Sequence, residues 1–382
     1  MVKPLTSKES EMRTLSTTLI AFIFLLAFNG TLRAQDEAKW YDGIAVNGFV
    51  ASSFTWNFNT PASGENGFRI FDKKHNSFSP DVFQLAIKRD AEKAGEAGFR
   101  ADLVTGMLPR YTASAGLFGN TNIDLLQAYA SYMAPVGSGL KLEMGKFLTH
   151  MGYELIEGSD GYNDNISRSF LFGYAIPFAH TGLRARYAFS DAVSAMVMVA
   201  NGWDNAVENN SNKTAGFQLG LVPTDGLSLY INGIHGAEME KNNSDATTVF
   251  DFVAVWSPVD RLSIGVNADF GSLAGGGAEG EDAKWTGFAG YLRYQVCERV
   301  ALALRGEMFD DADGVRTGVK QKLTEITFTP EFRLAQNFAL RADLRYDMSD
   351  QKVFEDGASL TDTTIEPSDA QMTFGLQMLF HF

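Results

Sequence analysis

The sequence has very little cysteine and histidine, with one Cys and five His among 382 residues. A single Cys excludes a disulfide framework and any zinc or redox site built from paired cysteines. No hydrolase motif accompanies the His residues, so we expect no enzyme, no metal and no cofactor. The 32 basic residues face 46 acidic ones, for a formal net charge of −14. This acidity argues against nucleic acid as a partner, because phosphate binding needs a basic face.

Long apolar runs are also scarce. The clearest one, residues 15–28, follows Lys3, Lys8 and Arg13 and is shorter than the ~20 residues that a spanning helix needs. A basic start, a short apolar stretch and a small-residue boundary are typical of a secretory signal. We therefore predict a cleaved signal peptide at 1–34 and one mature domain at 35–382, with a retained membrane anchor as the alternative.

The mature chain shows alternation of apolar and polar residues. Between positions 262 and 270, Leu, Ile, Val, Ala and Phe occupy one face, and Ser, Gly, Asn and Asp occupy the other. A period of two indicates β-strands with one apolar face. The predicted strands are 44–58, 78–88, 97–106, 123–133, 140–149, 181–189, 193–200, 215–222, 227–235, 248–256, 262–270, 285–296, 300–309, 323–334, 338–348 and 370–382.

The connections between these strands alternate in length, and the short ones carry turn residues such as Pro-Thr-Asp-Gly. A soluble sandwich also alternates apolar and polar residues, but it has no reason to sort its connections by parity. We therefore predict an all-β fold, a transmembrane antiparallel β-barrel of about 16 strands (14 to 18), with short periplasmic turns and long outer loops. Lipid offers no hydrogen bonds, so the sheet must close. The predicted location is a Gram-negative-type outer membrane, with its lipid as a partner.

Two features of the predicted strands concern single residues. Pro330 would face lipid and remove a ladder hydrogen bond, so we expect a bulge or a local register error there. Trp203 and Trp285 lie near the outer rim, where we expect them to belong to an aromatic girdle, with contact to sugars as the alternative.

The last segment, 371–382, alternates to the chain end and places Phe374, Phe380 and Phe382 in phase. It resembles the assembly signal of outer-membrane barrels. That resemblance implies the outer-membrane barrel assembly machinery as a partner.

The OmpL-like family of β-barrel porins resembles this chain in the order of several segments, which are 47–50, 54–59, 76–79, 145–154, 165–169, 176–187 and 201–204. The resemblance implies a water-filled channel for passive diffusion of small hydrophilic solutes or ions, without catalytic residues. An adhesin or structural barrel, or a barrel hydrolase, is the alternative function. The sequence leaves open whether the protein is a homo-oligomer, because general porins are often trimers but this chain carries no trimer signature.

The predicted register turns nearly equal numbers of basic and acidic residues inward. Charged side chains around a water-filled lumen are what gives a pore its selectivity. The pore-lining candidates are Arg100, Asp102, Lys141, Glu143, Arg184, Arg186, Arg293, Arg305, Glu307, Arg333, Arg341, Asp343 and Arg345.

The longest predicted connection, 150–180, supplies the candidate constriction. In general porins a long loop at this place folds into the lumen and faces a basic wall. We hypothesise that the acidic loop lies opposite Arg184, Arg186 and Arg100, where a transverse field would orient dipolar solutes. The alternative is that these arginines pair with lumen carboxylates and neutralise the wall. The loop candidates are Glu154, Glu157, Asp160, Asp164 and Arg168.

Overall fold

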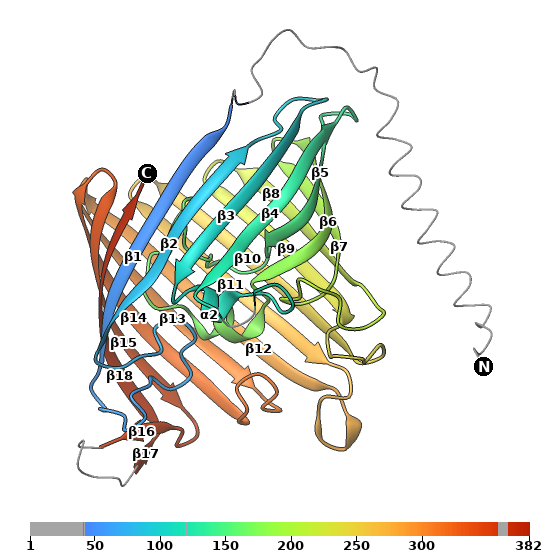
Figure 1. Ribbon diagram of the computed structural model, residues 1–382. Coiled ribbons are helices and arrows are strands. Elements are labelled where there is room, and N and C mark those ends of the chain that lie inside the picture. The colour runs from blue at the N-terminus through green and yellow to red at the C-terminus, as the bar shows by residue number, and fades with distance from the viewer. Residues whose placement is uncertain (1–40, 42, 119–120, 358–365) are drawn as a thin grey trace.

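The computed structural model describes residues 41, 43–118, 121–357 and 366–382, so the predicted signal peptide lies outside the described residues. The chain forms a closed barrel of antiparallel strands (Figure 1). Successive strands pair from β1 to β15, and β18 (Ala370–His381) closes the sheet between β15 and β1 (Ala45–Asn57). The prediction of a closed 16-strand barrel is confirmed.

The strands lie close to the predicted ranges, because alternation marks both the face and the length of each segment. The remaining barrel strands are β2 (Ser77–Arg89), β3 (Ala97–Gly106), β4 (Ile123–Ala134), β5 (Leu140–Leu148), β6 (Ala179–Ser190), β7 (Val193–Ala200), β8 (Thr214–Thr224), β9 (Leu227–Ala237), β10 (Ala246–Val259), β11 (Leu262–Leu273), β12 (Ala283–Cys297), β13 (Val300–Asp311), β14 (Gln321–Ala335) and β15 (Phe338–Ser349).

The other elements are short and belong to the long loops. They are a small hairpin of β16 (Phe354–Asp356) and β17 (Glu366–Ser368), the one-turn helix α2 (Pro109–Thr112), the π-helix η1 (Leu171–Ala175) and the 3-10 turn η2 (Ala278–Gly280). No helix in the described part of the chain is long and apolar enough to cross a membrane.

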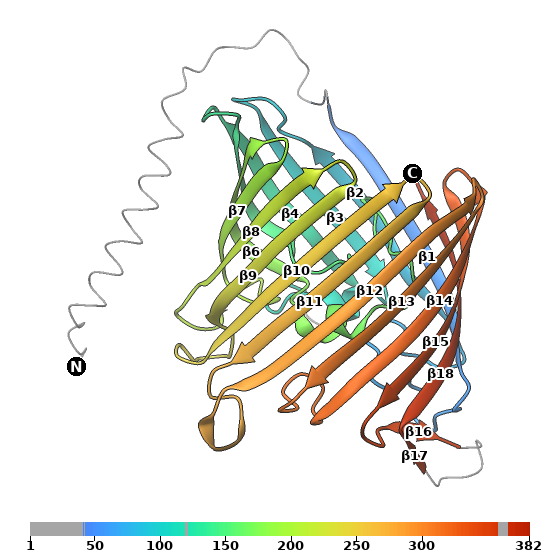
Figure 2. The same cartoon turned by 180° about the vertical axis from the view of Figure 1, so that it is seen from behind.

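Connection length follows parity, as predicted. The short turns lie at the rim that holds the start of β1 and the C-terminus, and the long loops lie at the opposite rim (Figures 1 and 2). Alternation also sorts the side chains. In β10, Phe250 and Phe252 are exposed on the outer face, whereas Asp251 between them is fully buried inside. The barrel thus has an apolar outer surface and a polar inner wall.

Pro330 does not disturb the sheet, so the expected bulge or register error is wrong. It pairs with Leu302 of β13, and the register toward β15 is unshifted between the Phe328–Leu344 and Glu331–Arg341 pairs. No residue pair joins β14 to β15 at Pro330 itself, so the missing N–H falls where that ladder is interrupted.

Candidate functional site in the barrel lumen

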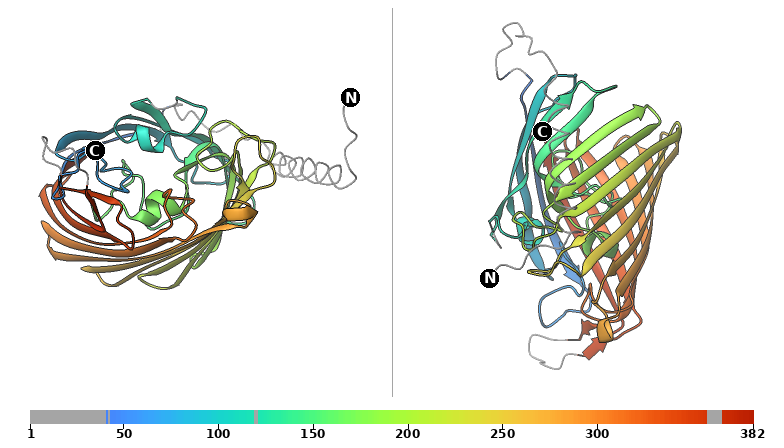
Figure 3. Two further views of the ribbon diagram at one scale, coloured as in Figure 1. Left: turned by 90° about the horizontal axis from the view of Figure 1, so that it is seen from below. Right: turned by 90° about the vertical axis from the view of Figure 1, so that its right-hand side faces the viewer.

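The main feature of the interior is the connection between β5 and β6, residues 149–178, called the lumen loop below. Seen along the barrel, it passes through the middle of the ring of strands (Figure 3). Its first residues reach β10 and β11, where the Gly152 N–H donates to Asp251 (3.1 Å) and the Tyr153 N–H donates to Asn267 (3.0 Å). The Tyr153 ring then stacks on Tyr291 of β12, with 4.0 Å between centroids.

Ion pairs fasten the lumen loop to the wall formed by β12–β15. Glu154 lies 2.6 Å from Arg305 of β13, and Glu157 lies 2.9 Å from Arg341 of β15. Arg168, on the loop itself, contacts Glu157 at 3.2 Å. Both wall arginines are fully buried, and buried charges of this kind persist because they are paired.

Wall carboxylates hold the backbone of the same loop. Asp343 accepts the N–H of Ser167 (2.8 Å), and Glu307 accepts the N–H of Phe170 (2.6 Å). The Arg345 side chain lies among the carboxylates of β13–β15 and has no exposed surface. These side chains of β13 and β15 therefore bind the loop rather than face an open lumen.

The far side of the loop reaches β2 and β3. Asp160 lies 2.6 Å from Arg100 and 3.8 Å from Lys88. Arg100 also contacts Asp102 at 2.8 Å. Contacts on both sides of the barrel thus fix the loop across the interior.

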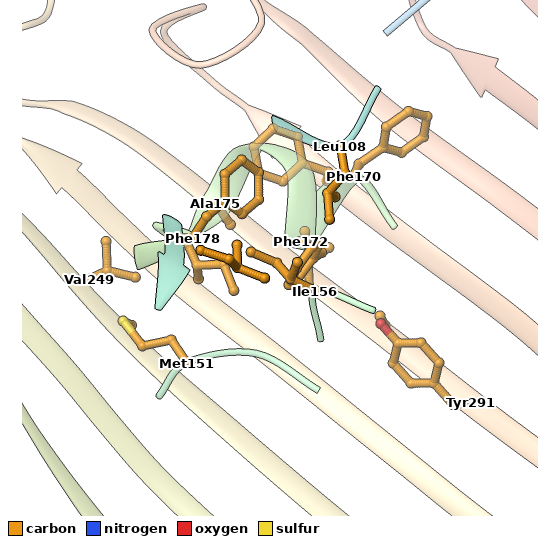
Figure 4. Close-up of a cluster of buried hydrophobic side chains, with 14 of the residues drawn as sticks. Leu108, Met151, Ile156, Phe170, Phe172, Ala175, Phe178, Val249 and Tyr291 are labelled. Carbon is orange, nitrogen blue, oxygen red and sulfur yellow. The ribbon is translucent and has the colours of Figure 1, made fainter. Parts of the chain in front are cut away.

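An apolar cluster of three outer connections supports this arrangement (Figure 4). Phe71, from the β1–β2 connection, packs against Phe172 and Phe178 of the lumen loop, with centroids 5.9 and 5.6 Å apart, and against Tyr111 at 6.0 Å. Leu108 of the β3–β4 connection is buried in the same cluster. Burial of these side chains stabilises the loop inside the barrel.

The acidic loop does not face Arg184 and Arg186, which corrects the constriction hypothesis. Both arginines contact Glu143 of β5, at 2.5 and 3.3 Å. In the part of the chain that the structure describes, no loop carboxylate forms an ion pair with either. Arg100, the third arginine of that hypothesis, does meet the loop, through Asp160 at 2.6 Å, and the other loop partners lie on the β12–β15 wall.

The pore-lining candidates all face inward, but they differ in exposure. The side chains that keep substantial exposed surface are Lys141 (27%), Arg186 (39%), Arg293 (20%) and Arg333 (41%). The buried candidates are Arg100, Asp102, Glu143, Arg184, Arg305, Glu307, Arg341, Asp343 and Arg345.

Asp164 joins the loop to one of the open arginines. Its carboxylate lies 2.9 Å from Arg293, which also contacts Glu331 at 3.1 Å. Arg333 reaches the same Glu331 at 3.5 Å. Two carboxylates therefore balance these two arginines.

Sequence reasoning missed an uncharged part of the lumen. A cavity of about 330 Å³ lies between the loop and β8–β10 and is lined by His150, Tyr153, Gln218, Tyr230 and Asn232, among others. The Gln218 amide donates to the carbonyl of His150 (3.0 Å) and to the Asn232 side chain (2.9 Å). The sequence signal that could have revealed this uncharged region is the presence of amide side chains at inward positions of otherwise apolar strands.

The girdle expectation is wrong for Trp285. This residue points into the barrel, is 1% exposed and donates its indole N–H to the carbonyl of Ala175 (3.2 Å). Trp203 packs under the Arg316 guanidinium, 4.6 Å from the ring centroid. Both tryptophans support loops instead of meeting lipid.

Metal-binding side chains are dispersed. The His150 and His180 rings lie 6.1 Å apart at the two ends of the loop. Within the described ranges, no three His, Cys, Asp or Glu side chains are grouped as a metal site.

A family model described as "Putative beta-barrel porin-2, OmpL-like" matches residues 43–382. The chain belongs to this family. A comparison with curated proteins finds no match. This OmpL-like porin is an outer-membrane channel protein, as the order of its sequence motifs predicted.

Solved structures show the same fold at low identity. The anion-selective porin from Comamonas acidovorans matches with a TM-score of 0.59 and 12% identity, covering 89% of this chain and 99% of that one. OprB of Pseudomonas putida in its high-pH structure gives 0.58 and 12%, covering 89% and 94%. In-vitro folded OmpT of Vibrio cholerae in a trimer form gives 0.57 and 11%, covering 89% and 99%.

Proposed function

We propose that this OmpL-like porin is a passive, non-catalytic diffusion pore for small hydrophilic solutes, in which the lumen loop leaves the solute path on the side of β5–β10. The cavity between the lumen loop and β8–β10 carries this proposal. Arg305 and Arg341 are completely covered by the loop, whereas Arg186 is 39% exposed. The cavity of about 330 Å³ adjoins β8–β10. A barrel of about this size normally leaves an aqueous channel.

The surroundings of the histidines support a non-catalytic barrel. The His150 ring contacts the carbonyl oxygen of Phe217 (3.0 Å), and the His180 ring contacts that of Gly202 (3.1 Å). A general base needs a ring nitrogen free to receive a proton from a nucleophile. The second nitrogen of His180 lies 3.3 Å from the Thr149 hydroxyl, so both nitrogens of that ring have partners, and in the proposed pore the two histidines hold the ends of the loop.

The proposal includes export and assembly. Residues 1–34 act as a cleaved signal, and the assembly machinery reads the end of β18. Phe374, Phe380 and Phe382 lie on the outer face with 37%, 36% and 55% exposure, where they also meet outer-membrane lipid. Phe382 pairs with Gly48 across the closing seam through backbone hydrogen bonds of 2.9 and 3.0 Å. The likeness to a trimer form of OmpT supports a homo-oligomer.

Liposome swelling with neutral sugars of increasing size tests the pore. We expect small sugars to permeate and larger ones to be excluded, with no esterase or protease turnover by the refolded protein. Permeation by none of the sugars would favour an adhesin or structural barrel, and turnover would favour a hydrolase.

The role of the loop is tested with the double variant Glu154→Gln and Glu157→Gln. Losing both carboxylates removes the pairs with Arg305 and Arg341, so the size limit should rise. Glu240→Gln is the matched control, because Glu240 is 70% exposed on an outer loop. An unchanged size limit in the double variant would contradict the proposed narrowing.

A further inference from the structure

Two pairs of neighbouring strands each place two basic side chains directly opposite one another. Lys88 of β2 faces Arg100 of β3, and Lys141 of β5 faces Arg186 of β6. Like charges directly opposite in a sheet are destabilising. Each of these rungs therefore needs negative charge placed over it.

The Lys88–Arg100 rung receives that charge from the chain itself. The Asp160 carboxylate spans it, with one oxygen 2.6 Å from Arg100 and the other 3.8 Å from Lys88. On the adjacent rung, Asp102 contacts Arg100 at 2.8 Å. Asp90 also lies 3.9 Å from Lys88, so three carboxylates serve these two cations, and one of them comes from the lumen loop.

The Lys141–Arg186 rung also has a carboxylate from the barrel wall, but it lacks a carboxylate from the lumen loop. Glu143, two residues after Lys141, contacts Lys141 at 3.7 Å, Arg186 at 3.3 Å and Arg184 at 2.5 Å. Across the described ranges, no other carboxylate forms an ion pair with these three cations. One carboxylate for three cations leaves two positive charges in excess.

The excess charge faces the open side of the lumen. The Lys141 and Arg186 side chains are 27% and 39% exposed, whereas Glu143 between them is 3% exposed. Across the sheet, Arg186 pairs with Met196 of β7, and Met196 pairs with Gln218 of β8, which lines the cavity. The basic rung and the uncharged cavity therefore adjoin.

We propose that the Lys141–Arg186 rung binds the carboxylate of a small organic anion, in the position that Asp160 takes over the Lys88–Arg100 rung. The neutral remainder of the solute lies along the cavity of His150, Tyr153 and Gln218. Guanidinium and ammonium groups suit this ligand, because charge-assisted hydrogen bonds to carboxylates are strong and directional. The inference rests on the proposed pore function and names its solute class.

Planar-bilayer recording of the folded protein tests this site with chloride and acetate as the probes. In a KCl gradient, we expect a reversal potential that shows chloride preferred over potassium. With KCl on one side and potassium acetate on the other, we expect acetate to permeate measurably. The double variant Lys141→Gln and Arg186→Gln should lower the chloride-to-potassium permeability ratio severalfold and acetate permeation by at least as much.

Arg333→Gln is the matched control for Arg186→Gln. Their side chains have nearly equal exposure, 41% and 39%, and each substitution removes one positive charge. Arg333 belongs to a balanced group, since Glu331 and Asp164 serve Arg293 and Arg333. We expect Arg333→Gln to change the permeability ratio much less. Heat-dependent gel mobility shows that each variant is folded.

The outcomes separate the two proposals. A wild-type channel that prefers potassium, or an equal effect of Arg333→Gln and Arg186→Gln, would overturn the carboxylate site and leave the pore intact. A folded wild-type protein that conducts no ions would overturn the pore function itself.

Discussion

The β13–β15 wall and the β5–β6 wall carry similar charge patterns but behave differently. On the first, Arg305 alternates with Glu307, and the arginine has no exposed surface. On the second, Glu143 is buried while Arg186 keeps 39% of its side-chain surface exposed. The lumen loop accounts for the difference, because it covers the first wall and not the second. The same residue type thus holds a loop in one place and faces water in the other.

The largest effect is expected on the covered wall. Arg305→Ala removes the guanidinium that lies 2.6 Å from Glu154 and 2.7 Å from Glu325, and of the two carboxylates Glu325 keeps an ion pair, with Arg345 at 3.5 Å. Loss of one member of a buried pair costs about 3–5 kcal/mol. We expect the free energy of unfolding to fall by about that amount and single-channel conductance to rise as the loop is released. Equal stability of Arg305→Ala and wild type in urea unfolding would show that this wall does not hold the loop.

A smaller loss is expected at the loop's own carboxylate. Glu157→Gln removes the charge between Arg341 (2.9 Å) and Arg168 (3.2 Å). Hydrogen bonds to charged groups are worth about 1.5–3 kcal/mol, so stability should fall within that range. Faster hydrogen exchange confined to residues 157–168 is the expected signature. Exchange no faster than in the Glu240→Gln control would contradict it.

The next effect in size is the pH dependence of stability that arises at the end of the lumen loop. Asp204, in the β7–β8 connection, accepts the N–H groups of Phe178 and Ala179, both at 2.8 Å. Burial raises the pKa of Asp204 from its usual value of 3.8 to about 6. The folded state therefore holds more protons than the unfolded state between those values, so this group's contribution to stability falls as pH rises through that window.

Thermal unfolding at several pH values between 4 and 7 measures this slope. Asp204 keeps partial contact with solvent, which reduces the effect of its charge. We therefore expect the free energy of unfolding of the wild type to fall by about 1–2 kcal/mol relative to Asp204→Asn across the window. Parallel pH profiles of the two proteins would exclude Asp204 as the source of this pH dependence.

The smallest stability effect is expected on the open wall. Arg186→Gln removes a partly exposed ion pair, and Glu143 keeps Arg184 at 2.5 Å. Such pairs contribute about 0–1 kcal/mol, so unfolding should change little while ion selectivity changes. A loss as large as that of Arg305→Ala would remove the distinction between the two walls.

The strands could be predicted closely, because a period of two is a local property of the chain. The segment predicted at 97–106 is observed as β3 with the same bounds, and β7 matches 193–200. The prediction at Pro330 was wrong because local rules describe what a proline lacks, not where the ladder is already interrupted. The burial of Trp285 was likewise beyond reach, since it depends on a contact between a strand and the lumen loop, whereas the Arg184–Glu143 pair joins neighbouring strands and matches the alternative of paired lumen charges.

By itself, the sequence determined which residues face inward, how the strands connect and which family the chain belongs to. Alternation, connection length and motif order are read along the chain. Only the tertiary structure decided which inward charges are covered. The loop carboxylate of Glu154 meets Arg305, 151 positions later, because the closed sheet places the strand of Arg305 around the lumen that the loop enters. Such pairing depends on the path of a loop through space, which no periodicity encodes.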